Sequence, residues 1–580
     1  MALKTPFPPV AAHEVLEVAS TFHDRKSPGP DGIPTVAIKY AVKCAPDSFA
    51  NLFSKCIAEG TFPDQWKVQR LVLLPKPGKD PNDPSAFRPI CMLDTVGKIF
   101  EKIIANRISK FVEESGSLSK QQFGFRRRKS TTDAAMMVKN IADKAIAGQR
   151  WAEGNKEYCL VLTLDIRNAF NSASWAQILR AMSRRNIPYY LRRITSSYLE
   201  NRVLRYNTEE GEKVYKISGG VPQGSVLGPL LWNLMYDDVL RLSLQGNSKI
   251  VGFADDIAVV VTGKHIQEIE IIASTCVSTI KEWLASVGLS LADEKTEAVL
   301  ITSRKKVEFA TIRIGNEEIR SKPHIRYLGV QFDNRLKFKE HLEYISGKAA
   351  RTVNALTRIM LNCRGPRQNR RKLLAGVVTS GIMYAAPVWC EAMSCPSYAR
   401  ELRAIYRRLC LRVCSAFRTV SEDAALVIAG LYPIDLLAAE AKKTYIGRHQ
   451  AEVVVDRSKR EVIKIWQERW DASDKGRWTH RLIPNIQKWL ERRHGEVDFH
   501  TCQILSGHGC FRAYFYKIGL EEDSLCRVCD MGASEDVEHV LFVCPRFKTE
   551  RDLIAKQVGY PLTSRNLIEA MLVARKTGWQ

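Results

Sequence analysis

A pair of adjacent aspartates between two apolar runs constrains this chain more than any other feature of its sequence. Residues 249–261 read Lys-Ile-Val-Gly-Phe-Ala-Asp-Asp-Ile-Ala-Val-Val-Val, so that β-branched and apolar residues flank Asp255 and Asp256 on both sides. Such runs around a tight polar step predict a β-hairpin with both carboxylates at its tip. Neighbouring carboxylates repel each other, which favours a cation between them. An ordinary Asp-rich turn with only local hydrogen bonds is the alternative.

A second carboxylate and a glycine-rich loop lie upstream of this hairpin. Residues 160–165 read Leu-Val-Leu-Thr-Leu-Asp, which predicts a buried strand that ends on Asp165. An ionised carboxylate at that position is costly unless it is paired or bound to a metal ion, although a satisfied helix cap is also compatible with the pattern. Residues 219–229 then form a glycine-rich loop before a predicted helix at 230–240, and such a loop lets the backbone approach a flat ligand closely.

The net charge of the chain indicates a polyanionic partner. Lysine and arginine exceed aspartate and glutamate by 87 to 63, for a net charge of +24. A charge of this size draws binding free energy from counterion release on a nucleic acid, whereas solubility alone is the competing explanation. No apolar run approaches the roughly 20 residues of a membrane span, and the N-terminus lacks the apolar core of a signal peptide. We therefore expect a location in the cytosol or the nucleus.

Other segments predict a mixed α/β region followed by helices. Strands are predicted at 70–74, 298–302 and 327–332, and helices around 98–104, at 131–147 and at 266–287; from about residue 340 helices dominate. The glycine- and proline-rich residues 26–34 predict a rigid loop. In residues 121–130, four consecutive cations, Arg126 to Lys129, adjoin Phe123 and Phe125, which predicts contact with phosphates and bases.

In chain order, nine motifs resemble the reverse transcriptases of non-LTR (LINE-type) retrotransposons. They are Ser-Pro-Gly-Pro-Asp-Gly at 27–32, Pro-Lys-Pro-Gly-Lys at 75–79, Phe-Arg-Pro-Ile at 87–90, Gly-Phe-Arg at 124–126, Leu-Asp at 164–165 with Ala-Phe at 169–170, Pro-Gln-Gly-Ser at 222–225, Phe-Ala-Asp-Asp at 253–256, Lys-Thr-Glu at 295–297 and Tyr-Leu-Gly at 327–329. The motifs cover roughly residues 15–335.

The resemblance implies an α+β right-hand polymerase with fingers, palm and thumb, followed by a mostly helical C-terminal region with a small zinc module. The expected domains are an N-terminal fingers extension (1–60), the fingers and palm (61–335), a helical thumb (336–450), a helical linker (451–505) and a zinc-knuckle region (506–580).

The resemblance also implies roles for individual residues. Two Mg²⁺ ions neutralise the attacking and leaving oxygens in nucleotidyl transfer, and Mg²⁺ prefers oxygen ligands. The expected ligands are Asp165, Asp255, Asp256 and the Ile166 backbone carbonyl.

Around these ligands, the resemblance places Phe170 as the steric gate against a ribose 2′-hydroxyl and the 327–329 motif as the primer grip. Residues expected to bind the incoming nucleotide or the template are Lys76, Arg88, Gln223 and Gly224. Lys295 is expected to donate a proton to pyrophosphate, with a plain surface lysine as the alternative.

The chain departs from the family pattern in three places. Arg128 stands where relatives usually carry glycine, Lys129 where they carry arginine, and Phe253 where they usually carry tyrosine. Full-length elements carry an endonuclease before the polymerase, whereas only about 25 residues precede the first motif here. A fragment, a degraded copy and an alternative start remain open, and no RNase H pattern is found.

Near the C-terminus, four residues have the spacing of metal ligands. Cys526, Cys529, His539 and Cys544 form C-x2-C-x9-H-x4-C, and three thiolates with one imidazole suit a structural tetrahedral Zn²⁺. Two core cysteines beside an unrelated histidine are the alternative. The family resemblance adds a CCHC knuckle that contacts nucleic acid. The nearby aromatics Phe511, Tyr514, Phe515 and Tyr516 are expected either to stack on bases or to form the core of the module.

The sequence therefore predicts an RNA-directed DNA polymerase. It would extend a DNA primer or target DNA on an RNA template with deoxynucleoside triphosphates, in a nuclear or cytoplasmic ribonucleoprotein. The alternatives are a catalytically idle nucleic-acid-binding remnant and a reverse transcriptase of the group II intron type.

Overall fold

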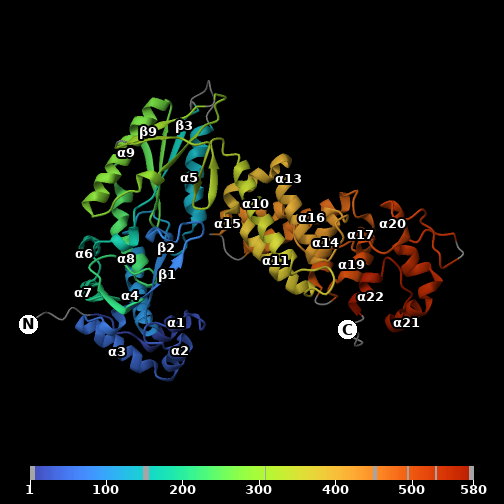
Figure 1. The fold of residues 1–580 in the computed structure, drawn as a ribbon, viewed down its shortest axis with the longest axis horizontal. Coiled ribbons are helices and arrows are strands. Elements are labelled where there is room, and N and C mark those ends of the chain that lie inside the picture. Colours follow the sequence, from blue (N-terminus) through green and yellow to red (C-terminus); the bar gives the residue numbers. More distant parts are fainter. Residues whose placement is uncertain are drawn as a thin grey trace, which may run out of the picture. The chain divides into compact units, whose positions relative to one another are not determined.

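The computed structural model (Figure 1) describes residues 7–147, 156–306, 308–315, 317–448, 453–492, 495–529 and 532–573. The chain divides into two compact units. The first comprises residues 1–329 with 334–336, and the second comprises 330–333 with 337–580. The division falls beside the expected palm–thumb boundary at 335/336. The finer subdivision of the second unit stays a prediction.

Four helices build the N-terminal part of the first unit: α1 (Ala12–Ser20), α2 (Thr35–Cys44), α3 (Pro46–Glu59) and α4 (Thr95–Glu114). The predicted loop at 26–34 is confirmed, and it is fixed to the start of α4. The Asp94 carboxylate accepts a hydrogen bond from the Asp31 amide at 3.0 Å, and a Cβ on Gly29 would lie 2.5 Å from the Asp94 backbone. Only glycine allows this approach.

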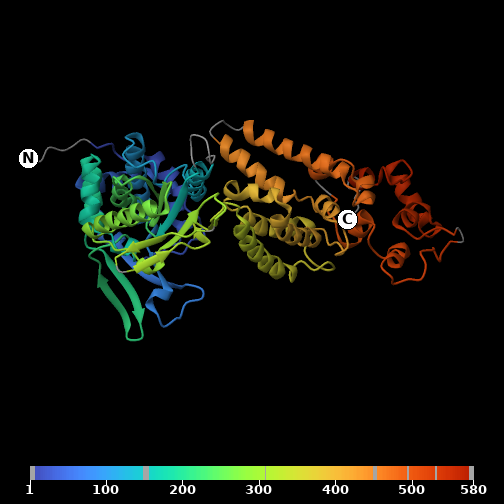
Figure 2. The ribbon, with the colours of Figure 1, turned by 90° about the horizontal axis from the view of Figure 1, so that it is seen from above.

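One four-stranded sheet of the first unit has the order β2-β1-β4-β5. Its strands are β1 (Val68–Pro75), β2 (Phe87–Met92), β4 (Val203–Thr208) and β5 (Gly211–Lys216). β1 is antiparallel to β2 and parallel to β4, so that two segments about 130 residues apart in sequence lie side by side. β4 and β5 form a hairpin that extends away from the rest of this unit (Figure 2).

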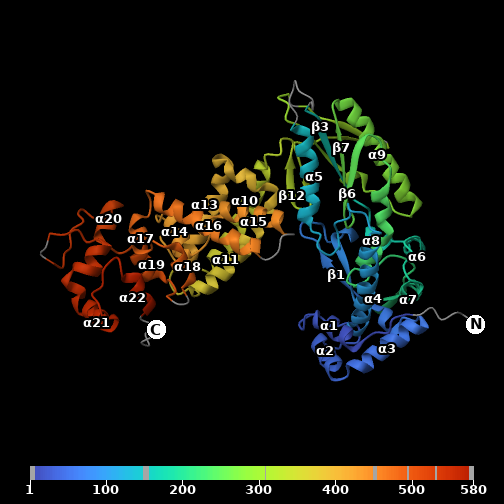
Figure 3. The same ribbon diagram turned by 180° about the vertical axis from the view of Figure 1, so that it is seen from behind.

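A second four-stranded sheet, the palm sheet, has the order β6-β7-β3-β8 and is antiparallel throughout. Its strands are β3 (Tyr158–Leu164), β6 (Asn247–Phe253), β7 (Asp256–Gly263) and β8 (Glu297–Ile301). Almost every residue of β3 is buried, because helices α5 (Thr131–Ile146) and α9 (Ile266–Ser286) pack against the sheet. Figure 3 shows the strands between these two helices. A strand covered on both faces explains the unbroken apolar run at 160–164.

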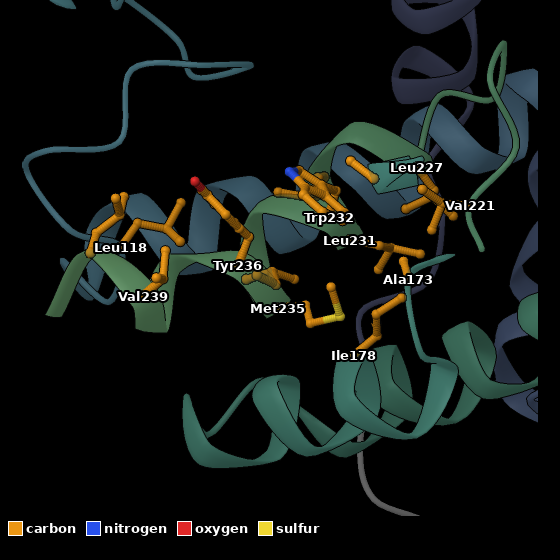
Figure 4. Packing of buried hydrophobic residues seen from close by; sticks show 14 of the residues in the cluster. Leu118, Ala173, Ile178, Val221, Leu227, Leu231, Trp232, Met235, Tyr236 and Val239 are labelled. Carbon is orange, nitrogen blue, oxygen red and sulfur yellow. The ribbon is translucent and has the colours of Figure 1, made fainter. Parts of the chain in front are cut away.

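A wholly buried helix, α8 (Gly228–Tyr236), follows the glycine-rich loop. Leu231, Trp232, Met235 and Tyr236 of α8 pack with Ile178 of α6 (Trp175–Arg184), as Figure 4 shows. The predicted helix at 230–240 therefore starts two residues earlier and gives way to a 3₁₀ turn at Asp237–Arg241. α7 (Tyr189–Leu199) completes this part of the first unit.

The strand predicted at 327–332 is wrong as a single element. The structure has two strands here, β11 (His324–Tyr327) and β12 (Val330–Asp333). Between them, Leu328 and Gly329 turn the chain, with φ values of 45° and 84°. The glycine was the only local signal for this turn. The remaining strands of the first unit are β9 (Thr311–Ile314) and β10 (Glu317–Arg320).

Helices make up the second unit after β12, as expected from residue 340 onward. No single helix in the described ranges is long and apolar enough to cross a membrane, although two bent pairs of helices, 368–394 and 422–447, pass by length and composition. The helices are α10 (Lys339–Thr357), α11 (Gln368–Ile382), α12 (Ala386–Trp389), α13 (Pro396–Val413), α14 (Glu422–Ala429), α15 (Ile434–Gly447), α16 (Val453–Ala472), α17 (Arg477–Leu482), α18 (Ile486–Glu491), α19 (Phe499–Ser506), α20 (Arg512–Lys517), α21 (Lys548–Val558) and α22 (Leu567–Val573).

Candidate active site

The Asp255-Asp256 hairpin is confirmed. β6 and β7 pair antiparallel, Phe253 lies opposite Asp256, and Ala254 and Asp255 form the two-residue turn. Ala254 adopts φ = 58°, a left-handed conformation that tight hairpin turns require and that a residue with a Cβ adopts at a cost. The surroundings of the turn must therefore hold it in place.

A short segment that precedes the basic loop supplies this support. The Phe123 amide donates to the Gly252 carbonyl at 2.8 Å, and the Gly252 amide donates to the Gln121 carbonyl at 3.0 Å, so this segment extends the sheet beyond β6. A Cβ on Gly124 would lie 2.1 Å from the Ala254 nitrogen. The Gly-Phe-Arg motif thus requires glycine because the Asp255-Asp256 turn lies directly against its backbone.

Asp165 lies beside this turn on the neighbouring strand. Leu164, the last residue of β3, pairs with Ile257 of β7. Asp165, the next residue along the chain, therefore lies level with Asp256. The Lys295 ammonium contacts the Asp165 carboxylate at 2.7 Å. The structure therefore brings the two carboxylate motifs and the predicted lysine together.

The backbone around Asp165 leaves one carbonyl available. The Asp165 carbonyl accepts from the Ala292 amide, and the Arg167 amide donates to the Ser290 carbonyl, both at 2.9 Å. In this antiparallel pairing the Ile166 carbonyl points to the opposite edge from those two bonds. Its position is compatible with the ligand role expected from the resemblance.

The protonation of the carboxylates reflects their crowding. Desolvation, followed by the charges of Asp255 and Asp165, raises the pKa of Asp256 to about 6. Desolvation also raises the pKa of Asp255, the charge of Asp165 adds to the rise, and Lys295 opposes it. Because Asp256 is exposed, we attribute the raised pKa of Asp256 mainly to repulsion by the neighbouring carboxylates and less to desolvation. Carboxylates held together in this way fit a site that receives hard divalent cations.

Phe170, the predicted gate, is held by other aromatic rings. Its ring lies 5.2 Å from that of Trp232 and 6.0 Å, edge-on, from that of Phe125. The Trp232 indole donates to the Ala254 carbonyl at 3.2 Å, so a single side chain contacts both Phe170 and the Asp255-Asp256 turn. Sequence reasoning missed Trp232 because nothing distinguishes it from the other apolar residues of a buried helix.

Gln223 and Gly224 lie between the palm and the strand that carries Arg88. The Val221 amide donates to the Phe170 carbonyl at 2.8 Å, and the Cys91 amide donates to the Gln223 carbonyl at 2.7 Å. Gly224 has φ = 123°, and a Cβ there would lie 2.5 Å from the Cys91 carbonyl oxygen. The glycine-rich loop therefore links the gate residue to β2.

Lys76 and Arg88 lie on the other sheet, at the β1–β2 hairpin. Lys76 directly follows β1 and its ammonium donates to the Ser85 carbonyl at 2.9 Å, while Arg88 pairs with Leu74 and is exposed. The structure places both residues on one projecting hairpin and not in contact with the palm carboxylates. Their triphosphate role stays a prediction.

Tyr327 of the predicted primer grip is buried rather than presented to a ligand. Burial and then the Asp256 charge raise the pKa of Tyr327, and burial followed by the charges of Asp255 and Asp256 raises that of Tyr236. Both tyrosines therefore lie near the Asp255-Asp256 turn. Leu328 and Gly329, which turn the chain after Tyr327, are half-buried.

The four consecutive cations of the basic loop, Arg126 to Lys129, do not all face solvent, and their contact with nucleic acid stays a prediction. Arg126 pairs with Glu113 at 2.7 Å and donates to the Ser119 carbonyl, which makes it structural. Arg127, Arg128 and Lys129 are exposed. Arg128 has φ = 61°, a left-handed conformation that favours glycine, the residue that the family pattern led us to expect at this position.

The four predicted zinc ligands converge in the second unit. Their ligand atoms all lie within 4.8 Å of one another, and they form the one such group found in the described part of the chain. The Cys526 and Cys544 sulfurs lie 3.9 Å apart, and the Cys529 sulfur lies 3.3 Å from His539 Nε2. Two thiolates on a tetrahedral zinc ion lie about 3.8 Å apart, given Zn–S bonds of about 2.3 Å, so the donor set fits this metal.

The aromatics near this cluster divide between two roles. Phe511 and Tyr514 are buried with Val537 in a small core, whereas Tyr516 is 53% exposed. Arg512 pairs with Glu521 and Asp523. Of the two roles expected for these aromatics, Phe511 and Tyr514 therefore take the one in the core of the module.

Comparison with known proteins agrees with this geometry. The family "Reverse transcriptase (RNA-dependent DNA polymerase)" matches residues 74–332. A Pol polyprotein of the type-1 retrotransposable element R1 from Bradysia coprophila is 30% identical over 95% of this chain and 56% of its own length. One from element R1 2 of Nasonia vitripennis is 32% identical over 58% of this chain and 87% of that protein.

Among solved structures, one similar chain is the apo telomerase of Candida tropicalis, truncated from its C-terminal domain. The match covers 46% of this chain and 54% of the telomerase chain, with 12% sequence identity and a TM-score of 0.34. The chain spans about half the length of the first curated relatives that it matches. The family match, the well-covered Nasonia relative and the palm geometry show that the chain belongs to the reverse transcriptases of non-LTR retrotransposons.

Proposed function

We propose that this chain is an RNA-directed DNA polymerase that extends a DNA primer on an RNA template. The observation that most directly supports this proposal is the position of Asp165 beside the Asp255-Asp256 turn, at the ends of the adjacent strands β3 and β7. Three carboxylates on one sheet edge supply the hard oxygen ligands that a nucleotidyl-transfer site needs.

Asp165 and Asp255, with Asp256 beside them, would hold two Mg²⁺ ions, and the Ile166 carbonyl would add a further ligand. When bound, these ions neutralise the attacking 3′-oxygen and the leaving pyrophosphate. Lys295 forms an ion pair with Asp165, and in this proposal it would give a proton to pyrophosphate.

The neighbouring loops would select and orient the nucleotide. The ring of Phe170 is fixed by Trp232 and Phe125, so it can exclude a 2′-hydroxyl without moving. Gln223 and Gly224 would contact the template and the nucleotide. Lys76 and Arg88, carried by the β1–β2 hairpin, would reach the triphosphate.

The Cys526, Cys529, His539 and Cys544 cluster would hold one structural Zn²⁺. All four positions of a tetrahedral ion are filled by protein atoms, so the site offers no open position for catalysis. The ion would tie together the chain on either side of the cluster, and exposed Tyr516 would remain for nucleic acid.

The partners follow from the chemistry and the charge. A net charge of +24 favours template RNA and primer or target DNA as ligands, in a ribonucleoprotein of the nucleus or cytoplasm. The direct test is primer extension by the purified chain with an RNA template, a DNA primer, deoxynucleotides and Mg²⁺. Extension that requires all four supports the proposal, and no extension under any divalent cation contradicts it.

A further inference from the structure

The hairpin formed by β4 and β5 leaves one edge of its sheet open. β5 is the last strand in the order β2-β1-β4-β5, and no strand in the described part of the chain pairs with its outer edge. All of its residues, Gly211–Lys216, are exposed. Val214 and Tyr215 lie on opposite faces of the strand and are 61% and 58% exposed. An exposed edge with apolar side chains on both faces is a template for pairing with another strand.

The backbone groups on this open edge follow from the hydrogen bonds inside the hairpin. The Ile217 amide donates to the Arg202 carbonyl at 3.0 Å, and β4 and β5 continue in the same register. Hydrogen-bonded and non-hydrogen-bonded pairs alternate along an antiparallel ladder, so every second residue of β5, beginning with Tyr215, bonds to β4. The amide and carbonyl groups that point to the open edge are those of Glu212, Val214 and Lys216.

Two charges of β5 are left without an opposite charge. Lys213 forms an ion pair with Glu210 at 2.5 Å, whereas neither Glu212 nor Lys216 forms an ion pair with a described residue. Glu212 and Lys216 lie on the same face of the strand. They cannot pair with each other, because a strand rises about 3.3 Å per residue and four residues separate them by about 13 Å.

A second copy of β5 pairs both charges in one register. Two copies related by a two-fold axis place one residue opposite its own copy. Centring the pair on either end of β5 leaves most of the strand unpaired, and centring it on Glu212 or Lys213 sets like charges directly opposite each other. Centring it on Tyr215 sets Val214 opposite Lys216. Centring it on Val214 sets Glu212 opposite Lys216 twice, and it sets Lys213 opposite the Tyr215 ring, a cation–π pair.

We propose that this chain forms a dimer through β5, in the register centred on Val214. The two four-stranded sheets then continue as one, and the edge amides and carbonyls bond to those of the second copy. The hairpin extends away from the rest of the first unit (Figure 2), so that its edge is accessible to a second chain. Because the contact is one strand wide, it belongs to the weak and reversible class of protein interfaces. This interface does not rest on the proposed polymerase function.

Charge reversal tests the register directly. Glu212→Lys sets lysine opposite lysine and Lys216→Glu sets glutamate opposite glutamate, so each variant should weaken self-association about tenfold or more. An equimolar mixture of the two variants pairs lysine with glutamate at both positions and should recover the wild-type affinity. Glu17→Lys and Lys43→Glu, exposed on α1 and α2, are the matched charge control. Alone and mixed, the control variants should associate as the wild type does.

Val214→Pro tests the backbone pairing. Proline removes an amide that points to the open edge rather than one that bonds to β4, so it should prevent dimer formation and retain the hairpin. The assay is sedimentation velocity of the full chain, purified free of nucleic acid, over a range of concentrations. Salt at about 0.15 M screens the repulsion between two chains that each carry a charge of +24. Thermal unfolding checks that each variant folds, and RNA affinity is measured on the same samples.

Three results would overturn the inference. The first is a wild-type chain that stays monomeric at every concentration, and the second is self-association that neither the charge variants nor Val214→Pro weaken. The third is a monomeric chain in which the charge variants change only RNA affinity, since the hairpin would then be a nucleic-acid contact. Primer extension on the same preparations keeps the two proposals distinct: a dimer that the variant mixture restores, in a chain that does not polymerise, would retain the interface and contradict the polymerase function.

Discussion

Gly124→Ala is expected to displace the catalytic turn without touching a carboxylate. The added Cβ would lie 2.1 Å from the Ala254 nitrogen, 2.8 Å from its Cα and 3.0 Å from the Phe253 carbonyl carbon. All three atoms belong to the backbone, so no side-chain rotation can relieve the clash. The two segments must separate by about 1.3 Å, the difference between 2.1 Å and an ordinary contact of 3.4 Å.

This displacement predicts a large loss of activity with a smaller loss of stability. Overpacking of this kind costs about 1–3 kcal/mol of unfolding free energy, whereas a shift of about 1 Å at reacting groups can reduce the rate about 100-fold. The assay is single-turnover primer extension, with chemical denaturation of the same sample.

Gly347→Ala is the matched control for this variant. Gly347 lies within α10, and a Cβ there meets only the end of the Arg351 side chain at 3.9 Å. Alanine should raise the stability of the helix by up to about 1 kcal/mol and leave extension unchanged. Wild-type extension rates in Gly124→Ala would refute the conclusion that the 121–124 segment holds the Asp-Asp turn.

Three further predictions concern single residues. Phe170→Ala should raise ribonucleotide incorporation relative to deoxynucleotide, measured as the ratio of the two kcat/KM values; an unchanged ratio would leave Phe170 as a packing residue for Trp232. Arg128→Gly should stabilise the chain by about 0.5–1 kcal/mol in denaturant titration, because φ = 61° costs arginine more than glycine; lower stability would mean that the Arg128 side chain makes a needed contact. Cys529→Ser should release about one zinc per chain by elemental analysis and weaken RNA binding while homopolymer extension survives; full zinc retention would argue against the metal site.

The palm was predictable from sequence because each of its elements has a strong local pattern. The apolar runs before Asp165 and around Asp255 specify strands, and the tight polar step between β6 and β7 specifies a turn. Antiparallel pairing of β3 with β7 then brings the two motifs together at the same end of the palm sheet. The Cys-x-x-Cys spacing identified the metal cluster for the same local reason.

The features that sequence reasoning missed depend on contacts between distant segments. Trp232 contacts the Asp-Asp turn, but it has no local pattern that differs from that of an ordinary core residue. Arg126 belongs to a run of cations, yet its partner Glu113 lies on the preceding helix. The turn at Leu328-Gly329 interrupts a run of residues that favour β-strand. Gly329 was the only residue in that run whose type indicated a turn.

The most direct test of the account is primer extension by Asp255→Asn. This variant removes one negative charge at nearly constant volume from the carboxylate cluster, and burial there already raises the pKa of Asp255. Asp47→Asn, on the exposed start of α3, is the charge-matched control. If the palm carboxylates hold the catalytic metal ions, Asp255→Asn abolishes extension at every Mg²⁺ concentration, while folding and RNA binding match the control. Undiminished synthesis by Asp255→Asn would contradict the assignment of the palm carboxylates as the catalytic centre.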